Sequence, residues 1–185
     1  MRAARLAMLL FLPLAACGSL PGTPSTPYLP PGVFGVYQDN DVGAINYSTW
    51  AFASAANTRG NPVAAMRAVI ALEYLPGELL ENPRWVGMDR LVKMRLQQAR
   101  MEVRQVLGIA PDAPPQLVVN ALLWASSALM AGDQAGALNA LSAPFFTLGP
   151  QQTLARFSDL PFVPDANLAT SRVSAQEFPS GGNRF

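Results

Sequence analysis

Residues 53–68, ASAANTRGNPVAAMRA, and residues 125–140, ASSALMAGDQAGALNA, follow the same plan of a helix, a tight turn and a second helix. Aligning Gly60 with Gly132 brings Asn61 onto Asp133, and both are residue types that cap helix N-termini. Small or apolar residues coincide on both sides of the turn: Ala53 with Ala125, Ala56 with Ala128, Ala65 with Ala137, Met66 with Leu138, and Ala68 with Ala140. A short connection makes consecutive helices neighbours, and small residues let their backbones approach closely. The repeat therefore predicts two antiparallel helical hairpins.

Start and stop signals predict further helices along the chain. The expected segments are about 44–58, 62–75, 84–107, 116–131, 133–142 and 150–157. Pro76-Gly77 is expected to end the second helix, and Gly108 the third. Because no segment alternates apolar and polar residues as a half-buried strand would, we predict an all-α fold. It would be a small bundle of about five to six helices arranged as antiparallel hairpins.

The small residues around the two turns resemble those of a tetratricopeptide helical hairpin. The matching positions are Ala53, Gly60 and Ala65 in the first copy, and Ala125, Gly132 and Ala137 in the second. Leu141 matches the large apolar position of the second helix, but Pro144 stands where a second Ala is expected. The usual Trp and Tyr of the first helix are also not in place, and a repeat array needs three or more stacked units. The resemblance implies helical hairpins, either as a relative of that family or as generic ones.

The N-terminus has the three parts of an export signal. Residues 1–16, MRAARLAMLLFLPLAA, combine a basic start, an apolar run and a small-residue end. The apolar run is shorter than the roughly 20 residues that a membrane-spanning helix needs. The run ends in Leu14-Ala15-Ala16-Cys17, which resembles the lipobox of bacterial lipoproteins. An exported protein with an unrelated Cys near its cleavage site is the alternative.

The lipobox resemblance implies cleavage before Cys17, a diacylglyceryl thioether on its sulfur and an acylated amino group. Stable membrane anchoring takes two or more acyl chains, which this modification supplies. Gly18 and Ser19 follow instead of the Asp that retains many lipoproteins at the inner membrane. By resemblance we expect an anchor in the outer membrane, on its periplasmic face, with the inner membrane as the alternative.

The composition after the signal predicts three further parts. Residues 17–38 form a lipidated, Pro-rich tether with polyproline II character, which could extend to about 65 Å. A ligand for a proline-reading domain is the alternative reading of these prolines. Residues 39–157 are the predicted α-helical domain. Residues 158–185, rich in small polar residues, are expected to be an irregular tail.

The composition also excludes several classes of function. The 185 residues contain no His and one Cys, which excludes Ser-His-Asp and Cys-His sites, imidazole-bound zinc and an internal disulfide. There are 13 Lys and Arg against 12 Asp and Glu, so no overall positive charge indicates a nucleic acid partner. We therefore expect one modest domain with no cofactor, no metal site and no nucleic acid partner.

Known catalytic motifs are missing from the sequence. It contains neither a Gly-x-Ser-x-Gly nucleophile turn nor a Gly-rich phosphate loop. Glu73, Glu78 and Glu81 are conceivable as the carboxylate pair of a cell-wall glycosidase. Because Glu78 and Glu81 are expected in a solvated loop, we predict that the protein is not an enzyme.

Two groups of side chains are candidate binding surfaces. In the 84–107 helix, four basic residues lie opposite the apolar face: Arg90, Lys93, Arg100 and Arg104. They predict either a solvated surface or a docking face for an acidic protein or anionic lipid. Five aromatic residues could line an apolar groove or pack in the core: Tyr47, Trp50, Tyr74, Trp85 and Trp124. The largely apolar 116–131 helix is expected at the centre of the bundle, where Asn120 would need a hydrogen-bond partner.

The anchor, the tether and the missing catalytic motifs together favour an interaction protein. We expect a membrane-anchored periplasmic lipoprotein that acts as a helical protein-interaction or scaffold module, bound to another envelope protein, in an oligomeric state that the sequence leaves open. The first alternative is a binding module for an apolar small molecule or lipid, which predicts a closed, aromatic-lined pocket of several hundred Å³. The second alternative is a carboxylate-dependent cell-wall hydrolase.

Overall fold

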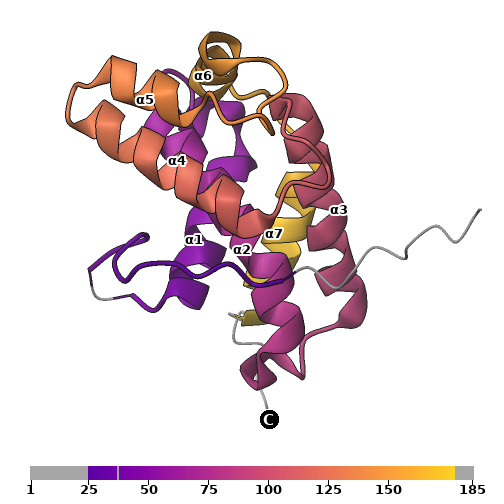
Figure 1. The fold of residues 1–185 in the computed structure, drawn as a ribbon. Coiled ribbons are helices and arrows are strands. Elements are labelled where there is room, and N and C mark those ends of the chain that lie inside the picture. The colour runs from indigo at the N-terminus through magenta and orange to yellow at the C-terminus, as the bar shows by residue number, and fades with distance from the viewer. Residues whose placement is uncertain (1–24, 37, 178–185) are drawn as a thin grey trace, which may run out of the picture.

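The structure of the protein is a computed structural model that describes residues 25–36 and 38–177. These residues form helices and turns, with no β-strand and one isolated bridge between Ile109 and Phe146. The α-helices are α1 (Asn40–Ala53), α2 (Pro62–Glu81), α3 (Arg90–Leu107), α4 (Pro115–Met130), α5 (Gln134–Ala140), α6 (Pro150–Ser158) and α7 (Pro164–Glu177) (Figure 1). Two 3-10 turns, η1 (Ala55–Asn57) and η2 (Pro83–Trp85), lie between them. The all-α prediction is confirmed, with seven α-helices in the described residues where five to six were expected.

The two turns that the sequence aligns have the same backbone geometry. Gly60 and Gly132 adopt the left-handed conformation, with φ of 71° and 75°, which a side chain would disfavour. The next residue caps the following helix in both copies: Asn61 accepts a hydrogen bond from the Ala64 amide, and Asp133 from the Gly136 amide. Each turn joins helices that pack on one another, α1 on α2 and α4 on α5.

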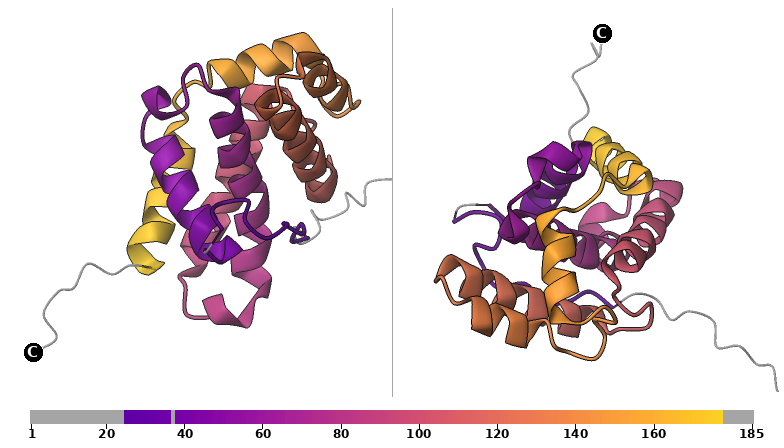
Figure 2. Two further views of the ribbon diagram at one scale, coloured as in Figure 1. Left: turned by 90° about the vertical axis from the view of Figure 1, so that its left-hand side faces the viewer. Right: turned by 90° about the horizontal axis from the view of Figure 1, so that it is seen from above.

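The central helix is α2, and the prediction that the 116–131 segment is central is wrong. Helix α2 packs against α1, α3, α4 and α6, and most of its residues are buried. Among the described helices, α4 packs against α2 and α5, and it leaves Leu117 50% and Trp124 74% exposed. Asn120 is exposed as well and accepts a hydrogen bond from Gln116. The views agree that α4 and α5 form one outer layer, with α1, α3 and α7 on the opposite side of α2 (Figures 1 and 2).

Several predicted helix boundaries differ from the observed ones, most of all the end of α2 and the start of α3. Helix α2 continues through Pro76-Gly77 to Glu81, because burial of Leu75 and Leu79 keeps its last turns in the core. The predicted 84–107 helix starts later, at Arg90, where the Asp89 carboxylate accepts a hydrogen bond from the Leu91 amide. In both cases tertiary packing and capping outweigh the local signal of the prolines.

The prediction of an irregular tail is wrong over Pro164–Glu177, which is helix α7. Its small residues are buried between α1 and α3: Ala166, Ala169, Thr170 and Val173. The Thr49 hydroxyl of α1 donates a hydrogen bond to the Thr170 carbonyl at 3.1 Å. Small residues suit such a position because they allow close approach of three helices, a preference that the composition alone did not reveal.

The second half of the predicted tether is part of the folded body. Residues 25–31, which we call the strap, cross the end of α2 and reach α4 (Figure 1). The Thr26 hydroxyl donates to Glu81 at 2.8 Å, and the Tyr28 amide donates to the Gln116 side chain at 2.6 Å. Leu29 is buried, and its carbonyl accepts a hydrogen bond from Asn40. The predicted tether is therefore not free over residues 25–31, and Cys17 lies outside the described residues.

Replacing Gly77 by alanine is expected to displace the strap without unfolding the bundle. A Cβ at Gly77 would lie 2.8 Å from the backbone nitrogen and Cα of Thr26, which is closer than real contacts allow. Alanine favours a helix interior over glycine by about 1 kcal/mol, so a gain in helix stability would accompany the loss of the strap. Hydrogen exchange at the Tyr28 and Leu29 amides should accelerate in the variant.

The matched control is Gly87→Ala, because a Cβ at Gly87 has no atom within 4 Å. Unchanged exchange at Tyr28 and Leu29 in the Gly77→Ala variant would contradict the packing of the strap on α2.

Candidate interaction surfaces

The four basic residues predicted as a docking face do not form one surface. Arg90 is exposed, but Lys93 and Arg104 are buried, and Arg100 is half-buried. The Lys93 ammonium donates a hydrogen bond to the Trp85 carbonyl at 2.6 Å, so it holds η2 against α3. Helix α3 packs this side on the rest of the bundle, and a free basic docking face is therefore not available there.

Arg104 and Glu73 form a buried ion pair between α3 and α2. Their side chains are 2% and 1% exposed, and the guanidinium donates to both carboxylate oxygens at 2.7 and 2.6 Å. The remaining nitrogen of Arg104 donates to three carbonyls of the α3–α4 connection: Ala110, Pro111 and Ala113. Such bidentate geometry suits Arg and not Lys. The pair fixes the loop after α3, so its role is structural.

Arg100 lies one turn before Arg104 on the same side of α3. Burial lowers the pKa of its guanidinium, while the nearby Glu73 carboxylate acts in the opposite direction. Its Nε and one terminal nitrogen are buried without a hydrogen-bond partner among the described residues. Two guanidinium groups thus lie near Glu73: Arg104 forms hydrogen bonds with it, whereas Arg100 interacts only through its charge.

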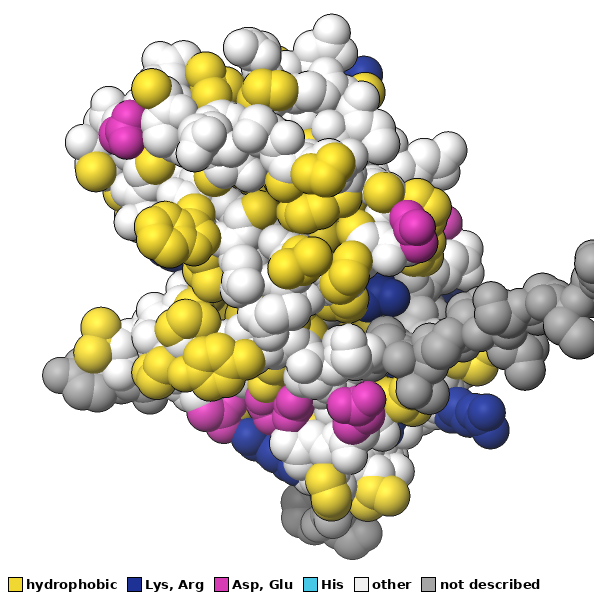
Figure 3. Space-filling view, in the orientation of Figure 1, with side chains coloured by type: hydrophobic (Ala, Val, Ile, Leu, Met, Phe, Trp, Pro, Cys, Tyr) yellow, Lys and Arg dark blue, Asp and Glu magenta, His cyan; other side chains and the backbone are white. Residues whose placement is uncertain are grey.

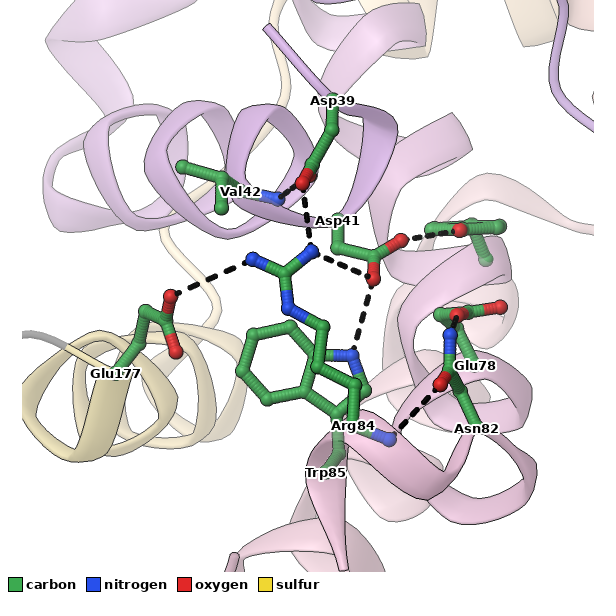
Figure 4. A network of polar contacts seen from close by, with 9 residues as sticks. Asp39, Asp41, Val42, Glu78, Asn82, Arg84, Trp85 and Glu177 are labelled. Atoms are coloured by element: carbon green, nitrogen blue, oxygen red, sulfur yellow. Dashed lines mark hydrogen bonds and ion pairs between the residues drawn. The ribbon is translucent and has the colours of Figure 1, made fainter.

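Two of the predicted groove residues, Tyr74 and Trp85, belong instead to a polar cluster around Asp41 (Figure 4). Asp41 is 7% exposed and accepts hydrogen bonds from the Tyr74 hydroxyl at 2.5 Å and the Trp85 indole at 3.1 Å. Burial, and then the contact with Asp41, raises the pKa of the Tyr74 hydroxyl well above its ordinary value, so it remains a donor at neutral pH. The Asp41 cluster joins the start of α1 to α2 and η2.

Arg84 closes the outer side of the Asp41 cluster. Its guanidinium lies 2.6 Å from Asp39, 3.5 Å from Asp41 and 4.0 Å from Glu177 at the end of α7, and it stacks over the Trp85 ring (Figure 4). Burial raises the pKa of the Asp39 carboxyl, but the Val42 amide and the Arg84 charge outweigh this, and the pKa is lowered overall. These contacts hold the ends of α1, η2 and α7 together.

Tyr47 and Trp50 lie together on α1, apart from the other predicted groove residues. Their ring centroids are 5.4 Å apart in an edge-on arrangement, and the centroid of the Phe34 ring lies 6.0 Å from that of Tyr47. The Arg67 guanidinium is 5.4 Å from the centre of the Tyr47 ring. These aromatic rings border an open groove of about 380 Å³. A single groove containing all five predicted aromatic residues is therefore not formed.

Trp124 lies on the outer side of the α4–α5 hairpin, which we call the hairpin face. Leu117 and Trp124 project from the same side of α4, where they are 50% and 74% exposed. Beside Trp124, small residues of α4, α5 and the turn between them line a groove of about 430 Å³, among them Ser127, Ala131 and Gly136. Figure 3 shows hydrophobic side chains gathered on this side of the molecule, with few charged ones over α4 and α5.

A second apolar surface lies between α3 and α7. The outer side of α3 exposes Leu91, Met94 and Met101, which are 55%, 56% and 37% exposed, and α7 adds Leu168 at 38%. Together with polar neighbours they line a groove of about 670 Å³, which we call the α3–α7 groove. The Gln98 amide bridges it by donating to Asp165 at 3.0 Å. Neither this groove nor those above is a closed aromatic pocket.

The three glutamates considered for catalysis are held by different partners. Glu73 is paired with Arg104, Glu78 accepts a hydrogen bond from Asn82, and Glu81 accepts one from Thr26. This arrangement does not place two of them across a common cleft, as carboxylate-dependent hydrolysis requires. Within residues 25–36 and 38–177, no group of three or more His, Cys, Asp or Glu side chains is placed to hold a metal ion.

The sequence analysis predicted the wrong side of α3 to be exposed to solvent. It weighed charge and took the basic stripe as the exposed one, although Leu91, Met94 and Met101 are spaced at three and seven residues and share a face. Apolar residues outside the core-facing stripe of a helix remain exposed to solvent. That signal was present in the sequence.

No helix among the described residues is long and apolar enough to cross a membrane. Comparison with known proteins gives no further information on identity: no family model, curated protein or solved structure matches this chain.

Proposed function

We propose that this protein is an envelope lipoprotein, anchored through lipid on Cys17 to the periplasmic face of the outer membrane, whose helical body docks another envelope protein. The anchor rests on the Leu14-Ala15-Ala16-Cys17 sequence that follows the apolar run. The docking function rests on one observation, the α3–α7 groove, whose apolar side chains are left without a partner among the described residues.

The chemistry of the α3–α7 groove fits the apolar face of an amphipathic helix. Leu91, Met94 and Met101 extend along about three turns of α3, a length that suits helix-in-groove recognition. Methionine side chains adapt to irregular partner surfaces because they are unbranched and polarisable. Arg95 and Asp165 at the rim add one charge of each sign, which would set the orientation of a bound helix.

In-cell photocrosslinking tests this proposal. A photoreactive phenylalanine analogue at Met94 in the full-length protein should give adducts with a defined envelope protein. A second substitution, Leu91→Glu, should reduce their yield by about tenfold, because it places a charge in the apolar groove. The mass of the N-terminal peptide of the same protein should show the acylated Cys17.

The matched control carries the analogue at Gln152, an exposed residue of α6 on a different surface. The docking proposal fails if Met94 gives no adducts, or if Gln152 gives the same ones. An unmodified thiol at Cys17 would overturn the anchor independently of the crosslinks.

A further inference from the structure

We propose that the hairpin face rests on the bilayer into which Cys17 is anchored, so that the lipoprotein lies against the membrane in one orientation. This inference rests on the lipid anchor of the proposed function. It assigns a lipid surface, and not a protein, to the outer side of α4 and α5.

The first observation is the lack of charge in this part of the chain. Residues 113–155, which include α4 and α5, carry a single charged side chain, Asp133. In a typical soluble domain about a quarter of the residues are charged. A surface that faces water gains little from losing its charges, whereas a surface at the edge of a bilayer must avoid the cost of desolvating them.

The second observation is the type of exposed side chain. Trp124, at 74% exposure, and Tyr28 of the strap, at 70%, are residues that prefer the boundary between lipid headgroups and acyl chains. Leu117 is exposed beside Trp124 on α4. The groove next to Trp124 is lined by small and uncharged residues such as Ala128 and Gly136, apart from Asp133 at its edge.

The third observation is where the described chain begins. The Tyr28 backbone is bound to Gln116 in the first turn of α4 through two hydrogen bonds, and the described chain begins three residues earlier, where Thr26 contacts the end of α2. The views show the strap on the same side of the molecule as α4, with α7 on the opposite side (Figure 2). Eight peptide links separate Cys17 from Ser25, and fully extended they span at most about 29 Å.

This short connection keeps the body close to the membrane. Trp124 lies two turns along α4 from Gln116, which is about 12 Å along the helix axis, within reach of the anchored strap. Because the anchor holds the body near the bilayer, docking of the face is an intramolecular step, and a few apolar side chains are enough to populate it. The α3–α7 groove lies on the other side of α2 and stays available for a protein.

Fluorescence quenching by brominated lipid tests the orientation. The acylated protein would be reconstituted in vesicles of phosphatidylethanolamine and phosphatidylglycerol whose acyl chains carry bromine. Its tryptophans are Trp50, Trp85 and Trp124, and Trp85 is buried. We expect Trp124→Phe to lose most of the bromine-dependent quenching and Trp50→Phe, the matched control on α1, to keep nearly all of it.

A second variant, Leu117→Gln, should weaken the quenching of Trp124 while leaving the urea midpoint unchanged, because Leu117 is half exposed. Quenching that survives Trp124→Phe would overturn the proposal, and so would the absence of quenching in protein whose N-terminal peptide carries the acyl chains. If Trp124 is unquenched in vesicles but protected from oxidation in cells, a protein covers this face and the lipid assignment is wrong. The mass of the N-terminal peptide shows independently whether Cys17 is acylated. An unmodified peptide would mean that the proposed anchor is wrong, whatever the quenching result.

Discussion

Replacing Arg104 by alanine is expected to lower the free energy of unfolding by about 3–5 kcal/mol. The substitution leaves the Glu73 carboxylate in the core, where it is 1% exposed and loses both of its short hydrogen bonds. It also leaves the carbonyls of Ala110, Pro111 and Ala113 without their donor, so the loop between α3 and α4 loses its attachment. Urea unfolding followed by circular dichroism measures the loss.

A double-mutant cycle separates the ion pair from the loop contacts. Glu73→Leu alone leaves the guanidinium buried without its carboxylate and should cost a similar amount, whereas Glu73→Leu with Arg104→Met removes both charges together. Replacing a buried pair by apolar residues is often close to neutral, so the double variant should be more stable than either single one. It should remain below the wild type, because the carbonyls of Pro111 and Ala113 still lose the Arg104 donor, whereas that of Ala110 keeps the Ala113 amide.

Arg90→Ala provides the matched control on the same helix. Arg90 is exposed, and surface substitutions of this kind change stability by less than about 0.5 kcal/mol. Equal effects of Arg90→Ala and Arg104→Ala would show that the buried pair does not stabilise the fold.

Some elements of the fold can be predicted from the sequence and others cannot. The hairpin turns are predictable because a left-handed glycine followed by Asn61 or Asp133 is a local signal, and local signals do not depend on the rest of the fold. The continuation of α2 through Pro76 is not predictable from local sequence, because it depends on burial of the last turns of α2 in the core. Helix α7 was missed for a similar reason, since its small residues gain stability only between α1 and α3.

The predicted basic face of α3 and the predicted aromatic groove were wrong because sequence periodicity does not show which side chains are exposed. The spacing of Arg100 and Arg104 places them on one side of α3, but only the position of Glu73 on α2 shows that this side faces inward. Of the five aromatic residues, Tyr74 and Trp85 are buried because Asp41 gives their polar atoms a partner. Such pairings join residues more than 30 positions apart, and no periodicity reveals them.

The prediction of a free tether also depended on contacts that the sequence does not reveal. Prolines between residues 21 and 31 indicate an extended backbone, and residues 25–30 form no helix or strand, but such a segment can lie on a surface as well as leave it. The hydrogen bonds that Thr26 and Tyr28 donate to Glu81 and Gln116 hold the strap on the surface of the bundle. The reach of the anchor shrinks accordingly, from about 65 Å for a free tether to about 29 Å.

Asp41→Ala is the substitution outside the ion pair with the largest expected effect, a loss of about 3 kcal/mol in the free energy of unfolding. It removes the Asp41 carboxylate that accepts from the Tyr74 hydroxyl and the Trp85 indole N–H, and both side chains are buried. Each unsatisfied buried donor costs about 1–3 kcal/mol. Asp41→Asn keeps one acceptor oxygen and should lose about half as much.

Asp39→Asn is the matched control for Asp41, because the two acids lie two residues apart and both contact Arg84. Asn caps a helix about as well as Asp, so this variant keeps the hydrogen bond to the Val42 amide and loses only the exposed ion pair. Its cost should stay below about 1 kcal/mol. Combining Asp41→Ala with Tyr74→Phe should then recover part of the loss, because the phenylalanine brings no unsatisfied hydroxyl. If Asp39→Asn destabilises the protein as much as Asp41→Ala, the surface ion pair and not the buried acceptor holds α1 to α2 and η2.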